Sequence, residues 1–132
     1  MSFTSKGILE YSVLEPGISY KATLVVDAEV ARYYRSFVPK SQKCQPGRYA
    51  PHVTVVRNEL PSNMKKWGLY EGQEIEFEYD SYIWYDGTYW WLNCNSLFLE
   101  RVREELGLPR WAKWNMPPDG KACFHMTIGN SK

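Results

Sequence analysis

The sequence predicts a single α+β domain, residues 1–132, in which an antiparallel β-structure carries helices on its outside. Three observations lead to this class. Several segments alternate apolar and polar residues with the period of two that a strand imposes, and two others place apolar residues at helical spacing. The chain has 132 residues, of which 44% are hydrophobic, and this is enough for one sizeable core.

The N-terminal part contains the first clear strand. Residues 1–17 are polar and end in the turn signal Pro16-Gly17. Residues 18–26 then alternate, and their apolar face includes Tyr20. On this pattern alone Tyr20 is a core aromatic residue.

A helix and a basic loop follow this strand. Asp27 suits the N-cap of a helix over residues 28–38, because its carboxylate can accept backbone N–H groups of the first turn, and Pro39 blocks continuation. Residues 40–49 form a basic loop that contains proline and glycine and could close over an anion. Its candidates for phosphate contact, with solvated loop charge as the alternative reading, are Lys40, Lys43 and Arg48.

The central part predicts a β-hairpin. Residues 73–85 alternate over a long stretch, Asp86-Gly87 is a hairpin signal, and residues 88–94 return as the partner strand. The aromatic surface near the turn exceeds what a two-stranded ribbon can hide, so it either packs under a neighbour or offers a platform for stacking bases. The cluster consists of Tyr82, Trp84, Tyr89, Trp90 and Trp91, of which Tyr82 and Trp84 are the preferred stacking candidates because they leave the apolar face.

The C-terminal part repeats the order of elements in the first half. Asn95 or Ser96 can cap a helix that ends near Gly107, and residues 108–122 form a loop. Each half therefore contains a strand, a helix and a loop that leads into a histidine segment. This parallel favours two lobes related by a pseudo-twofold axis, with the histidine strands meeting across a cleft.

Two segments, residues 51–55 and 124–128, contain the only two histidines of the chain. Each histidine is followed two positions later by a threonine, although the chain has only five threonines. Because residues two apart in a strand share a face, each segment predicts an apolar back and a front of imidazole and hydroxyl. The pairs are His52 with Thr54 and His125 with Thr127.

Two such pairs suit acid–base chemistry on a phosphate. An imidazole titrates near neutrality, so one can act as base while the other acts as acid, and a threonine hydroxyl can donate to an anionic oxygen. The alternative for each histidine is a half-buried strand residue that is hydrogen-bonded to a neighbour. Repetition in two matching strands favours the functional interpretation, and the sequence leaves open which histidine is the base.

On these motifs, the chain resembles the two-histidine (2H) phosphoesterase superfamily, which includes LigT-like enzymes. The resemblance depends on the two His-x-Thr pairs and covers nearly the whole chain. Residues 18–21 and 29–34 make it most similar, within the superfamily, to the phage anti-CBASS nucleases that destroy cyclic oligonucleotide signals.

The resemblance implies a two-lobed fold, with antiparallel sheets flanking a central cleft and helices outside, and metal-free cleavage of 3',5' bonds in a cyclic di- or oligonucleotide. It also implies a cleft-facing Tyr20, because a tyrosine on the first strand faces the cleft of the phage nucleases. The catalytic candidates are thus His52, Thr54, His125, Thr127 and Tyr20, and the substrate-binding candidates are Tyr82, Trp84, Arg48 and Lys43.

Composition limits the other partners. A net charge of +1 argues against a long nucleic-acid track. No apolar stretch has the length of a membrane span, and the first residues lack a secretory pattern. The three cysteines show no Cys-x-x-Cys spacing, which fits reduced thiols and argues against zinc. We therefore expect a cytoplasmic protein, in the host cytoplasm if a phage encodes it, with no cofactor and no metal.

Two rival functions use the same pocket. One is a 2H enzyme that acts on 2',3'-cyclic or 2',5'-linked RNA ends. The other is a non-catalytic protein that sequesters a nucleotide. Incubation with a cyclic dinucleotide distinguishes these two functions from the cyclic-oligonucleotide nuclease, because the three differ in the products formed, if any.

Overall fold

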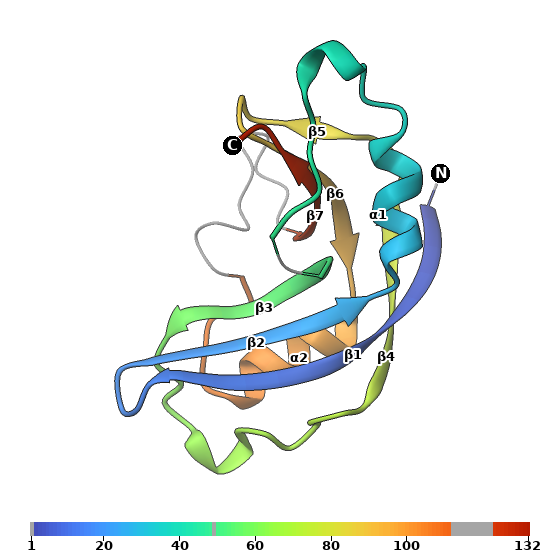
Figure 1. Cartoon of the computed structure of the whole chain (residues 1–132). Coiled ribbons are helices and arrows are strands. Elements are labelled where there is room, and N and C mark those ends of the chain that lie inside the picture. Colours follow the sequence, from blue (N-terminus) through green and yellow to red (C-terminus); the bar gives the residue numbers. More distant parts are fainter. Residues whose placement is uncertain (1, 49, 112–122) are drawn as a thin grey trace.

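The computed structural model describes residues 2–48, 50–111 and 123–132. These residues form an antiparallel sheet of seven strands with two α-helices, which confirms the α+β class (Figure 1). None of the described helices has the length and apolar character needed to cross a membrane. The strands are β1 (Ser2–Glu15), β2 (Ser19–Val26), β3 (His52–Glu59), β4 (Glu74–Asp80), β5 (Trp84–Tyr85), β6 (Tyr89–Asn95) and β7 (Phe124–Asn130), and the helices are α1 (Ala28–Arg35) and α2 (Leu97–Glu105).

The strand order is β4-β1-β2-β3-β7-β6-β5, and β4 also pairs with β6. This last pairing brings the sheet round on itself, so that six strands form a ring from which β5 projects as the hairpin partner of β6 (Figure 1). The connectivity is symmetric about the β3–β7 pair. On one side β1, β2, α1 and β3 follow each other along the chain, and on the other β5, β6, α2 and β7 do so.

Strand β1 corrects the expectation that residues 1–17 are a polar lead-in. It pairs with β2 along one edge and with β4 along the other, so its backbone groups are satisfied within the sheet. Few of its side chains are buried; Leu9 is fully buried. Residues 9–13 alternate, but Ile8 and Leu14 place apolar residues on the other face too, so the pattern of the whole strand is weak and the strand was missed.

The hairpin is confirmed, but the strand before it is shorter than the alternation of residues 73–85 suggests. Strand β4 ends at Asp80, just after Glu78 and Tyr79 pair with β6, and β5 then pairs with β6 at Trp84 and Tyr85. At the turn, the Asp86 carboxylate accepts the backbone N–H groups of Thr88 and Tyr89, and these bonds lower the pKa of the carboxyl group.

Both helices begin where the sequence predicts. The Asp27 carboxylate accepts the N–H of Glu29 at the start of α1, and the Ser96 hydroxyl accepts the N–H of Leu99 at the start of α2. Helix α1 ends at Arg35, three residues before the predicted end, and continues as turns. Of its three aromatic residues, counting Phe37 in the turns that follow, Tyr34 is buried whereas Tyr33 and Phe37 are each 59% exposed.

One hydrophobic core joins the sheet to both helices. The apolar backs of the histidine segments lie in it, since Val53 and Met126 are fully buried. The front of each segment is thereby fixed on the opposite face of its strand. Further members are Leu9, Leu24, Phe77 and Leu92 from the sheet and Leu99 and Val102 from α2.

Candidate functional site

The two histidine strands meet at one antiparallel bridge, between Val53 and Met126. Paired residues point to the same face of a sheet, and their neighbours along each strand point to the other. The neighbours here are the four motif residues. Antiparallel register sets His52 beside Thr127 and His125 beside Thr54.

Histidine and threonine thus alternate around the bridge. The two histidines occupy diagonal positions, for which Cβ atoms lie about 7–8 Å apart. The structure therefore brings together the four residues that the sequence singles out.

A bulge follows each motif. Strand β3 pairs with β2 through Thr54 and then Val56, which leaves Val55 as an extra residue. Strand β7 pairs with β6 through Thr127 and then Gly129, which leaves Ile128 as the extra residue. Bulges redirect the side chains beside them, so both threonines sit where the strand direction changes.

The His52 ring lies at the surface of a large cleft. Its Nδ1 is 2.9 Å from the carbonyl oxygen of Ala50. Because a carbonyl only accepts, Nδ1 carries the proton in this contact, and Nε2 remains for proton exchange with a ligand.

His125 lies deeper and is not among the residues that line the cleft. Its ring centroid is 5.3 Å from that of Trp91, whose Nε1 donates to the Asn93 side chain. The His125 Nε2 is buried and has no hydrogen-bond partner within the described part of the chain. Burial lowers the pKa of His125, so the neutral ring is favoured near pH 7.

The cleft has a volume of about 1260 Å³, larger than the range of about 300–1,000 Å³ usual for small ligands. His52, Thr54 and Thr127 lie in its wall. Its only carboxylate among the described residues, Glu29, is paired with Arg32. The cleft also has six cationic side chains, so its surface is positively charged and attracts anions. These side chains are Lys21, Arg32, Arg35, Arg48, Arg57 and Lys132.

Tyr20 requires a correction. It lies on the core face of β2, is 7% exposed, and packs edge-on against Trp67. Its hydroxyl accepts the backbone N–H of Gly17. Alternation puts the neighbouring Lys21 on the cleft face instead, so the core interpretation of Tyr20 holds and the cleft-facing one is wrong.

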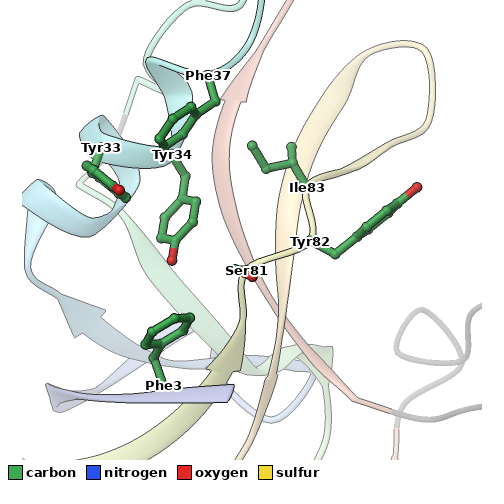
Figure 2. A pocket seen from close by; sticks show the side chains of 7 residues that line it. All are labelled: Phe3, Tyr33, Tyr34, Phe37, Ser81, Tyr82 and Ile83. Carbon is green, nitrogen blue, oxygen red and sulfur yellow. The ribbon is translucent and has the colours of Figure 1, made fainter. Parts of the chain in front are cut away.

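The aromatic candidates also lie elsewhere. Tyr82 lines a separate cavity of about 470 Å³ (Figure 2). Trp84 contacts the Tyr82 ring. Two other aromatic residues have contacts at the site: Tyr89 lines the cleft, and Trp91 contacts His125. Of the three basic loop candidates, Arg48 lines the cleft, whereas Lys40 and Lys43 do not.

Sequence reasoning missed most of the cationic wall. Arg32 and Arg35 lie on the polar face of α1, and the amphipathic pattern does not indicate which part of the protein that face borders. Lys21 and Arg57 pair across β2 and β3, and this register is invisible in a linear sequence. One signal could have identified Lys21: it lies on the face of β2 opposite the apolar face that contains Tyr20.

Among the residues that the structure describes, no three His, Cys, Asp or Glu side chains are grouped closely enough to hold a metal ion. Comparisons with protein-family models, curated proteins and solved structures gave no significant match to this chain. Function is therefore inferred from the site: two diagonal imidazoles, two hydroxyls and a basic cleft.

Proposed function

We propose that this protein is a metal-independent phosphodiesterase of the two-histidine type that cleaves 3',5' bonds in cyclic di- or oligonucleotides. One observation carries the proposal. The bridge between Val53 and Met126 sets both His-x-Thr segments side by side, and three of their four polar residues line a basic cleft.

In this mechanism, His125 is the general base. Its ring is kept neutral by burial, and its Nε2 lacks a partner among the described residues. Because this nitrogen is buried outside the cleft lining, the mechanism requires the His125 ring to turn toward the cleft, where the ribose 2'-hydroxyl next to the scissile phosphate gives its proton to Nε2. The resulting 2'-oxygen attacks phosphorus and forms a 2',3'-cyclic phosphate.

His52 is the general acid. As the bond from phosphorus to the 5'-oxygen breaks, Nε2 of the protonated ring gives its proton to that oxygen. The Ala50 carbonyl holds the Nδ1–H and fixes the ring orientation. Thr54 and Thr127 donate to the non-bridging oxygens, where charge develops in the transition state.

The substrate class follows from charge and size. A cleft with six cationic side chains suits a ligand with more than one phosphate, and its volume exceeds the range usual for small-molecule sites. The symmetric connectivity about β3 and β7 supports the two-lobed arrangement of the superfamily that the motifs resemble.

The experiment incubates the purified protein with a 3',3'-cyclic dinucleotide in EDTA and separates the products. We expect cleavage to linear products, and loss of at least about 10²-fold in kcat for both His52→Ala and His125→Ala. Thr4→Ala, on the distant strand β1, is the control and retains activity. If the protein cleaved only linear RNA ends, the proposal of a cyclic nucleotide substrate would be wrong and the RNA-end phosphodiesterase would take its place.

One observation favours a second function. The Nε2 of His125 is buried, so a protein that binds a nucleotide in the cleft without cleaving it needs no change in this region. Tight binding with unchanged nucleotide after long incubation would establish sequestration.

A further inference from the structure

Two arginines make equivalent hydrogen bonds beside the two motifs. Nη1 of Arg35, at the end of α1, donates to the Ile128 carbonyl at 2.9 Å. Nη1 of Arg103, near the end of α2, donates to the Val55 carbonyl at 2.8 Å. Ile128 and Val55 are the extra residues of the two bulges, and each directly follows a motif threonine.

The two bonds cross between the halves of the sheet. Helix α1 leads into β3, yet its arginine reaches β7; α2 precedes β7 in the chain, yet its arginine reaches β3. Each helix is thereby tied to the motif of the other half. Since β3 and β7 share only one bridge, these ties reinforce the contact between the halves next to the two motifs.

A bulge needs such support. Its extra residue is left out of the regular ladder, so the local direction of the strand is free to vary. A guanidinium bonded to the bulge carbonyl restricts that freedom. The threonine hydroxyl one residue earlier is held as a consequence, and a displacement of about 1 Å at such a group costs on the order of 10²-fold in rate.

We infer that Arg35 and Arg103 are a matched pair of positioning residues, each fixing the bulge and the threonine of the opposite motif. The effect on rate rests on the proposed function, whereas the effect on the position of the bulge does not.

The two arginines differ in their surroundings. Arg103 is 0% exposed, and its charge is matched by Glu59, to which two guanidinium nitrogens donate at 2.8 Å each. Arg35 lines the cleft and has no carboxylate partner among the described residues. Arg35 is thus the member of the pair that can be replaced without breaking an ion pair.

The test replaces Arg35 and records two quantities. Arg35→Met keeps an unbranched stem and removes the donor, Arg35→Lys keeps a donor, and Arg101→Met removes an exposed charge from α2 as a control. The first quantity is the methyl NMR shift of Thr127 and Ile128 without ligand. The second is kcat and KM on the 3',3'-cyclic dinucleotide.

We expect Arg35→Met to move both methyl signals and to lower kcat by on the order of 10²-fold. Arg35→Lys should recover at least a tenth of the lost kcat, and Arg101→Met should change neither quantity. If Arg35→Met does not fold, Arg35→Lys still shifts the Thr127 methyl signal, because the donor geometry changes.

Unmoved methyl signals in both Arg35 variants would overturn the inference, as would a lowered thermal midpoint with unchanged kcat. A raised KM with unchanged kcat would make Arg35 a substrate contact and would also overturn it. An inactive wild-type protein would refute the proposed function alone, because the methyl signals still decide the positioning role.

Discussion

At the scale of single residues, the burial of His125 makes stability depend on pH. Its pKa in the folded protein lies below the value of about 6.5 expected in the unfolded chain. Between these two values the unfolded state binds more protons, so the free energy of unfolding falls as pH drops below about 6.5. The loss is complete once pH passes the folded pKa.

The prediction compares urea unfolding of the wild-type protein and His125→Gln from pH 7.5 to 5. The wild-type free energy of unfolding should decline more steeply in this window, because the glutamine variant lacks the titrating group. Parallel curves for the two proteins would mean that burial of His125 has no energetic effect.

The two motif threonines are predicted to act on the transition state. Thr54→Val and Thr127→Val preserve shape and remove the hydroxyl, so each should lower kcat by about 10²–10³-fold with little change in KM. Steady-state kinetics on the cyclic dinucleotide measures this.

Thr23 provides the matched control. It pairs with Thr54 across β2 and β3 but is not among the residues that line the cleft. Thr23→Val should therefore leave kcat within about twofold of wild type. Equal losses at Thr23 and Thr54 would point to a general effect on the strands.

At the scale of elements, the ion pair of Arg103 and Glu59 joins α2 to β3. The Arg103 side chain is fully buried and the Glu59 side chain is 20% exposed. Glu59→Ala leaves a buried guanidinium without its carboxylate, so it should lower the free energy of unfolding by about 3 kcal/mol.

Urea denaturation measures this loss, with Glu29→Ala as the control. Glu29 and its partner Arg32 are both exposed, so their pair contributes at most about 1 kcal/mol. If Glu59→Ala cost no more than Glu29→Ala, the tie between α2 and β3 would be unimportant to the fold.

The elements show how far local patterns reach. Caps, turns and alternation are local, and Asp27, Ser96, the Asp86-Gly87 hairpin and the faces of β2 were all predicted from them. Pairing with distant partners is not local. Strand β1 and the buried Arg103 were missed, because each depends on contacts made far along the chain.

At the scale of the whole molecule, a net charge of +1 conceals two surfaces of opposite sign. The cleft gathers six cationic side chains. The exposed face of β4 gathers carboxylates at Glu74, Glu76 and Glu78. An anionic substrate should therefore be drawn to one side of the protein.

This separation predicts a salt effect on substrate binding. KM for the cyclic dinucleotide should rise several-fold between 0.05 and 0.5 M salt, because salt screens the attraction of the cleft. Arg57→Ala should raise KM at low salt and weaken the salt dependence. Glu76→Gln, on the acidic face, is the control, and an equal effect there would exclude a local role for the cleft.

The site itself was predictable only in part. The spacing of His52 with Thr54 and of His125 with Thr127 is a local signal, and the fold brings the two pairs together. The wall around them comes from α1, β2, β3 and the C-terminal residues, which only the register of the sheet assembles. This explains why Tyr20 and Tyr82 were selected while Lys21 and Arg35 were overlooked.

The most direct test of the central claim is a crystal structure with a 2'-deoxy cyclic dinucleotide, which lacks the attacking hydroxyl. We predict one phosphate between the two rings, with Nε2 of His52 about 2.6–3.2 Å from its 5'-oxygen and Nε2 of His125 facing the 2'-carbon. A nucleotide bound with either ring turned away from that phosphate, or bound outside the cleft, would contradict the account.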